Sequence, residues 1–193
     1  MTHPLRWALA LLAVLLLASP GESTSVKALS EADLVQDART IFWGECVEAR
    51  SEWTADRRRV VTRVTFDVRE IFKSDATPPG GPTIDLVIPG GALDGVTYVV
   101  HGMPRFAPGE EVLVYASASH PSSGVRVPVG LAQGIYRVKR KDGVATARRD
   151  TREAHLVGPE GVVPGHLQEL PLEALLARIR AQVRKAARPG MGR

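Results

Sequence analysis

The chain has 193 residues and a formal net charge of +4, with 44% hydrophobic and 24% charged residues. This balance excludes a disordered polymer and suits one globular domain with its own core. The single cysteine, Cys46, excludes an internal disulfide and paired-cysteine metal sites, so we expect a buried, inert thiol in a core held by packing alone.

The first 23 residues have the pattern of a secretory signal peptide. One cation, Arg6, precedes the unbroken apolar run Trp7–Ala18, and the turn-prone Ser19-Pro20-Gly21 follows it. The run has about 12 residues, against the roughly 20 that cross a bilayer as a helix, so no transmembrane segment is expected after signal cleavage. The sequence therefore predicts an exported protein, periplasmic or secreted, with a signal peptide over residues 1–23.

A single domain is expected over residues 30–187, preceded by a flexible leader over residues 24–29. Ser30 is followed three residues later by Asp33, which resembles a capping box with the shorter acid. This start predicts a short helix through about Ala38.

Two longer strands are predicted next. Arg39–Ala49 is apolar enough to be buried on both faces over part of its length, and Gly44 inside it indicates a bulge. Arg59–Phe72 alternates apolar and polar residues, the pattern of a half-buried strand. The alternation slips near Glu70, so a second bulge or a strand end is expected there.

Three shorter strands are predicted over Thr83–Ile88, Val96–Val100 and Glu111–Ser119, after a Pro- and Gly-rich loop over residues 74–82. Alternate residues of the half-buried strand and of two of these shorter strands should form one inward face. We expect that face to contain Val64, Phe66, Ile84, Leu86, Val112 and Val114.

The last part of the chain predicts a hairpin and a helix. Gly134–Lys141 and Val144–Arg149 flank Asp142-Gly143, a dipeptide favoured by type I′ turns because both turn positions need a positive φ. A helix is expected from Pro171 through about Ala187, with apolar residues at helical spacing. Its apolar stripe consists of Leu172, Leu175, Leu176, Ile179 and Val183.

These elements favour a mainly β fold: a small closed OB-like barrel of five or six strands, with a short N-terminal helix and a docked C-terminal amphipathic helix. Closure would remove the exposed strand edges of an open sheet. An open sandwich is the alternative. Residues 188–193 are expected to form a flexible basic tail.

Three segments resemble a group of uncharacterised exported bacterial proteins. They are the Pro89-Gly90-Gly91 turn, the segment Gly102–Glu110, which has the form Gly-Met-Pro-x-Phe-x-Pro-Gly-Glu, and Gln133-Gly134 ahead of a strand. The resemblance covers roughly residues 38–138 and implies no activity. More distantly, the strand order is similar to the OB-fold domain of tissue inhibitors of metalloproteinases and netrin-type modules, which implies a fold and not a function. Those inhibitors chelate zinc with an N-terminal cysteine, whereas Cys46 lies well inside the domain.

No motif typical of catalysis, metal binding or phosphate binding occurs in the sequence. His101, His120, His155 and His166 lie far apart, and neither a Gly-x-Ser-x-Gly elbow nor a Walker A loop is present. Aromatic residues are only 5% of the chain, too few for the stacking platforms of single-strand nucleic-acid binding. We therefore assign no catalytic residue, cofactor or metal ligand and expect no nucleic-acid partner.

The segment His101–Phe106 is the best candidate for a partner-binding surface. Met103, Arg105 and Phe106 in a loop bounded by Gly and Pro match the composition of interface hot spots. The alternative is that Met103 and Phe106 fill one end of the barrel.

Three functions remain open on the sequence. The first is an exported, non-enzymatic binding module for another exported protein, a protease being one candidate partner. The second is a binder of anionic cell-surface or polysaccharide ligands through the basic C-terminal helix, and the third is an unrecognised hydrolase. The cations of the second hypothesis are Arg178, Arg184, Lys185 and Arg188, which also suit a solvated helix end.

Overall fold

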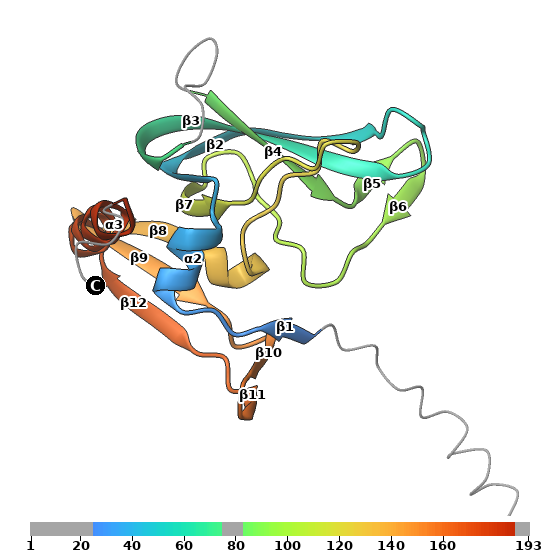
Figure 1. Ribbon diagram of the computed structural model, residues 1–193. Coiled ribbons are helices and arrows are strands. Elements are labelled where there is room, and N and C mark those ends of the chain that lie inside the picture. The colour runs from blue at the N-terminus through green and yellow to red at the C-terminus, as the bar shows by residue number, and fades with distance from the viewer. Residues whose placement is uncertain (1–24, 75–82, 188–193) are drawn as a thin grey trace, which may run out of the picture.

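The computed structural model describes residues 25–74 and 83–187 (Figure 1). The predicted signal peptide, the basic tail and most of the Pro- and Gly-rich loop lie outside these residues. The main element is an antiparallel sheet of seven strands. In spatial order they are β12 (Leu167–Pro171), β9 (Val144–Asp150), β8 (Ile135–Lys141), β7 (Glu111–Ala116), β2 (Thr40–Trp53), β3 (Val60–Lys73) and β4 (Thr83–Pro89).

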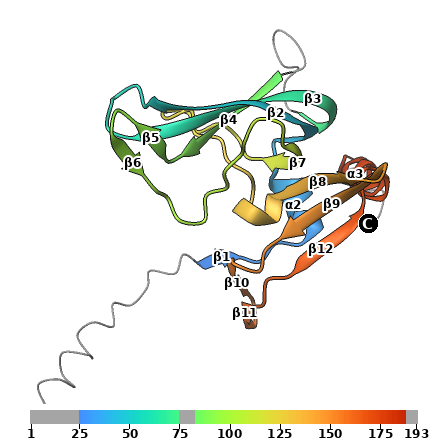
Figure 2. The ribbon, with the colours of Figure 1, turned by 180° about the vertical axis from the view of Figure 1, so that it is seen from behind.

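Two small sheets and three helices complete the described chain. The helices are α2 (Glu31–Asp37), the 3-10 helix η1 (Leu131–Gly134) and α3 (Leu172–Ala186). One small sheet contains β1 (Ser25–Lys27), β10 (His155–Gly158) and β11 (Gly161–Val163), and the other is the hairpin of β5 (Gly91–Leu93) and β6 (Val96–Tyr98). Seen from behind, the first lies beside β12, away from the upper strands (Figure 2).

The prediction of a mainly β fold with a C-terminal helix is confirmed, but no sheet in the described residues closes into a barrel. The large sheet has two ends, β12 and β4. Isolated bridges join Val87 of β4 to Arg126, and Ala116 of β7 to Pro128, so the segment around residues 126–128 contacts both strands. The described residues contain twelve strands rather than five or six. Several of them have only three residues, too few to show an alternating pattern.

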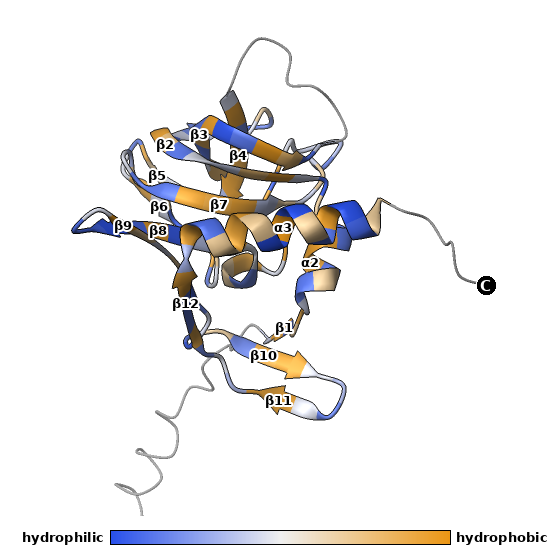
Figure 3. Cartoon of the chain, turned by 90° about the vertical axis from the view of Figure 1, so that its left-hand side faces the viewer, coloured by the Kyte–Doolittle hydropathy of each residue, from blue (hydrophilic) through white to orange (hydrophobic). Residues whose placement is uncertain are grey.

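A separate apolar core lies on each face of the large sheet. Strand β7 supplies both cores by alternation: Leu113 and Tyr115 face α2 and α3, while Val112 and Val114 face the opposite core. Figure 3 shows α3 across one face of the sheet, with α2 nearby. All six residues of the predicted inward face lie in the opposite core, so the strand registers inferred from alternation are correct.

The bulge expected at Gly44 and the slip expected near Glu70 are one irregularity of the β2–β3 pair. Trp43 pairs with Glu70 and Gly44 pairs with Val68, so Arg69 is the extra residue of a bulge. A Cβ on Gly44 would collide with the carbonyl oxygen of Asp67, which explains the glycine.

Local signals in the sequence are also confirmed. The Ser30 hydroxyl accepts from the Asp33 amide at 3.2 Å and the Asp33 carboxylate accepts from the Ser30 amide at 2.9 Å, which completes a capping box. Asp142 and Gly143 have φ of 50° and 78°, as a type I′ turn requires.

Helix α3 is fixed to the sheet by charge as well as by its apolar stripe. The Arg180 guanidinium donates to both oxygens of Glu70, at 2.8 and 2.6 Å, and lies 5.7 Å from the centre of the Phe72 ring. Such a two-point contact sets the orientation of the helix.

A largely buried carboxylate joins four central strands. Glu111 of β7 accepts from Trp43 of β2, Arg69 of β3 and Arg140 of β8, at 2.8–2.9 Å. Burial opposes its charge, but the Arg140 hydrogen bond and the nearby Arg69 outweigh burial and hold the pKa of Glu111 below its usual range.

Part of the predicted flexible leader is ordered. Ser25–Lys27 forms β1, which pairs in parallel with β10. The buried Gln133 side chain accepts from the Leu29 amide at 2.8 Å and donates to the Lys27 carbonyl at 2.9 Å. A three-residue strand with a partner this distant in sequence leaves no local pattern to detect.

Replacing Phe66 tests the core on the face of the sheet opposite α2 and α3. Phe66 is fully buried and contacts Phe42 and Phe106 edge to face, each with ring centres 5.2 Å apart. Phe66→Ala should lower the free energy of unfolding by about 3–5 kcal/mol, measured by denaturant titration. Val162→Ala, at a side chain that is 81% exposed, should change it by less than about 0.5 kcal/mol. A loss below about 1 kcal/mol for Phe66→Ala would contradict the assigned register.

Candidate functional site

The segment from Val99 to Glu110 is a long loop anchored at its second half. Phe106 is 8% exposed and packs perpendicular to Phe66 at the end of the core. Met103 is partly buried against the same core. These two residues therefore have the packing role that the sequence left as an alternative.

Arg137 of β8 holds this loop in place. Its guanidinium donates to the Arg105 carbonyl and to the Glu110 carboxylate, both at 2.7 Å, and lies 5.6 Å from the Phe106 ring centre. The Glu110 carboxylate also accepts from the Ala107 amide at 2.9 Å. The Gly-Met-Pro-x-Phe-x-Pro-Gly-Glu segment thus forms a braced loop with a defined shape.

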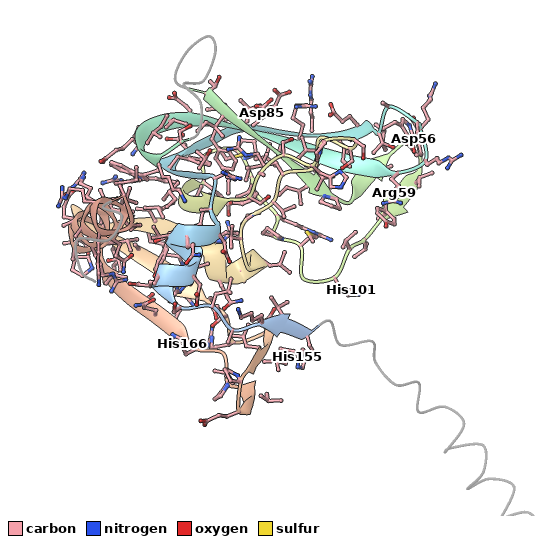
Figure 4. All side chains as sticks on the ribbon, viewed as in Figure 1. Asp56, Arg59, Asp85, His101, His155 and His166 are labelled. Carbon is pink, nitrogen blue, oxygen red and sulfur yellow. The ribbon has the colours of Figure 1, made fainter. Side chains whose placement is uncertain are left out.

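The other two candidate residues of this loop are exposed. The Arg105 side chain makes no hydrogen bond or ion pair within the described residues. His101 lies at the turn of the loop, where Figure 4 shows it at the edge of the molecule. The structure therefore divides the four predicted residues into two that pack against the core and two that are exposed.

The loop separates two depressions of the surface. The first, which we call the small hollow, has a volume of about 320 Å³ and lies between the loop, the β5–β6 hairpin and strands β2, β3 and β4. Its apolar lining includes Ala49, Val64, Tyr98, Val99, Met103 and Phe106, and Arg105 is its one charged residue.

The second depression, the large cleft, has a volume of about 720 Å³. His101 and Met103 border it on the loop side, and Val26 and His155 border it on the side of β1 and β10. Figure 4 labels His101 on the loop and His155 on β10. Met103 lines both depressions, so the loop forms the wall between them.

Charged residues of both signs line the large cleft. They are Arg137, Lys139, Arg148, Asp150 and Glu153. The hydrogen bonds of Arg152 lower the pKa of Asp150, and Arg148 forms ion pairs with Asp150 and Glu169 at 3.4 and 3.7 Å. Lys139 has no ion pair within the described part of the chain.

The charged face of the large cleft could be predicted from the Asp142-Gly143 turn and strand alternation, although neither composition nor motifs indicate it. The Asp142-Gly143 turn sets the register of β8 and β9, which places Arg137 opposite Arg148. Alternate residues of the two strands then share one face, so the turn and the alternation together are enough to group Arg137, Lys139 and Arg148.

The basic C-terminal helix is less free than the sequence suggested. Arg178 forms an ion pair with Glu31 at 2.6 Å, which ties α3 to α2. Arg184 and Lys185 are at least partly exposed, and Arg188 lies outside the described residues. Of the four cations in that hypothesis, one is thus used inside the fold.

Neither a metal centre nor a membrane helix is found in the described ranges. No group of three or more His, Cys, Asp or Glu side chains in them could hold a metal ion. No helix in the same ranges has the length and hydropathy to span a bilayer. Ser122 Oγ lies 3.2 Å from His120 Nδ1, but both residues belong to one exposed turn outside the two depressions.

The chain was compared with protein-family models, curated proteins and solved structures, and none of these matches it.

Removing the Arg137 brace should loosen the loop. Arg137→Gln removes two charge-assisted hydrogen bonds, each with a net value of about 1.5–3 kcal/mol when well formed. Because Arg137 is partly exposed, we expect the smaller effect of roughly tenfold faster hydrogen exchange at the Met103 and Ala107 amides, measured by NMR. Lys139→Gln, on the same face, is the control and should leave both amides unchanged. Equal exchange in the two variants would show that the loop holds its shape without Arg137.

Proposed function

We propose that this chain is an exported, non-enzymatic binding module whose partner is another exported protein. The loop from Val99 to Glu110 is the proposed contact surface. An exported protease is the first class of partner to test.

The observation that carries the proposal is that some residues of the loop hold it on the core while others are exposed. Phe106 and Met103 hold it on the core, and Arg137 braces its backbone, while Arg105 and His101 face outward. A loop that is already ordered loses little conformational entropy on binding, which favours affinity. An exposed Arg beside an apolar hollow is also the residue type enriched among interface hot spots.

We propose that the half of the molecule that presents the loop is barrel-like. Two isolated bridges between β4, residues 126–128 and β7 support this part of the proposal. Loops presented by rigid β frames commonly carry binding functions.

Binding would not use the cysteine chemistry of the metalloproteinase inhibitors. Cys46 is fully buried, and burial, followed by the nearby Glu110, raises the pKa of its thiol. A partner protease would therefore be contacted through the loop and not through a thiolate.

The anionic-surface function is the weaker alternative. Arg178 pairs with Glu31, so this function would depend on Arg184, Lys185 and Arg188 alone. Binding through them should weaken steeply as salt rises.

Arg105→Ala separates binding from folding. Because this exposed side chain has no partner within the described residues, its loss should change the free energy of unfolding by less than about 0.5 kcal/mol. Capture of the native partner from the exported fraction should fall by at least about tenfold. Lys141→Ala, also at an exposed cation, is the matched control for both measurements. A lower melting temperature with unchanged capture would assign the loop a structural role only.

Export has its own test. The mature chain should begin between about Gly21 and Val26, because Pro20 disfavours cleavage directly after Ser19. Sequencing of the N-terminus of protein recovered from the exported fraction measures this. An intact Met1 there would contradict the signal-peptide assignment.

A further inference from the structure

We propose that the small hollow and the outer edge of β6 together bind an extended segment of the partner, one that carries a large apolar side chain next to an acidic residue. This inference rests on the proposed function and specifies the chemistry of the partner. It depends on three independent observations that meet at the β5–β6 hairpin.

The first observation is a free strand edge. Asp94 and Gly95 have φ of 52° and 76° and form the turn, with Leu93 paired to Val96 and Gly91 to Tyr98. In an antiparallel pair closed by a two-residue turn, the residues next to the turn bond inward and alternate residues face outward. The backbone groups of Thr97 therefore face away from β5. Neither these groups nor those of Val99, the first residue after β6, have a backbone partner elsewhere in the described residues.

The second observation is the apolar character of this place. Val96, Tyr98 and Val99 are 46%, 41% and 50% exposed, so three exposed apolar side chains are concentrated in β6 and the residue that follows it. Tyr98 and Val99 also line the small hollow. A volume of about 320 Å³ is at the lower limit for small-molecule sites and suits one inserted side chain. Clustered exposure of this kind indicates an interaction surface, because isolated apolar residues are ordinary on protein surfaces.

The third observation is the charge at the hollow. Arg105 is the one charged residue in its lining, and its guanidinium is without a partner among the described residues. A carboxylate next to the inserted side chain could form a bidentate contact with it. In the large cleft, by contrast, carboxylates and cations both line the wall, which gives no preference of sign.

These features define one binding mode. Main-chain hydrogen bonds to Thr97 and Val99 would extend the β5–β6 sheet by one strand, and the hollow would select the side chain. Arg105 would then select against a basic neighbour, since a like charge there is repelled.

The first experiment uses the mature protein and a doubly blocked pentapeptide with a central Phe flanked by Glu residues. Titration followed by 15N NMR should shift the amide signals of Thr97, Val99 and Ala49 in a saturable manner. The same peptide with an N-methyl group on the Phe nitrogen, which cannot donate that hydrogen bond, should bind at least about tenfold more weakly. Equal binding of the methylated peptide would overturn the strand-addition mode.

The second experiment reverses the charge at Arg105 and on the peptide. Arg105→Glu should lose about tenfold in affinity for the Glu-flanked peptide and gain affinity for its Lys-flanked counterpart. Lys141→Glu, at an exposed site outside the hollow, should leave both affinities unchanged. Ala49→Leu should fill the hollow and abolish binding, and a thermal melt verifies that this variant folds. The Arg105→Glu test stands even if the Ala49→Leu variant does not fold.

The results also identify other occupants. Shifts on octanoate addition that match those of the peptide would assign the hollow to a small amphiphile and overturn the proposal. Shifts of the same signals on concentrating the protein alone would assign it to a second copy of the chain, with the same consequence. Capture of the native partner that depends on Arg105 while no peptide binds the hollow would overturn this inference and leave the proposed function standing. If Arg105→Ala leaves partner capture unchanged, the proposed function fails as well.

Discussion

The whole molecule depends on the antiparallel pair of β2 and β7 being buried on both faces. Their side chains alternate between two cores, so neither face can be solvated without exposing apolar residues such as Phe42 or Ile41. Helices α2 and α3 cover one face. Strands β3 and β4, together with Phe106 of the long loop, cover the other. The Glu111 network lies on the helix side of this pair and joins it to β3 and β8. The position of the loop therefore follows from the demand for burial on the second face.

Much of this architecture could be read from local patterns. Alternation over Val60–Phe66 predicted the correct inward face, and Gly44 and the slip near Glu70 located one of the three register shifts of the β2–β3 pair. Ser30 and Asp142-Gly143 marked a helix start and a turn because each signal acts within four residues. Sheet closure could not be read in this way. It depends on how β12 and β4 end the strand order, and no short pattern encodes that.

The candidate site was predictable in its location but not in its division of roles. Composition singled out residues 101–106, but two of the four residues serve packing and two are exposed, which depends on the direction of each side chain relative to the core. The brace by Arg137 could not be predicted either, because it joins residues 27 and 32 positions apart, with β7, a loop and η1 between them. In the C-terminal helix, sequence could count cations but could not show that Glu31 neutralises Arg178.

The contacts of the N-terminal segment have a consequence for the order of events during synthesis. Leu29 bonds to a side chain 104 positions later, and Glu31 to one 151 positions later. A nascent chain of half length would have α2, β2 and β3 but not β7 or α3, so the helix side would be only partly covered, since α3 is the last of the described elements to be made. Contacts of such long range slow folding because the intervening chain must be ordered first. Full burial of the helix side therefore has to wait until α3 has been made.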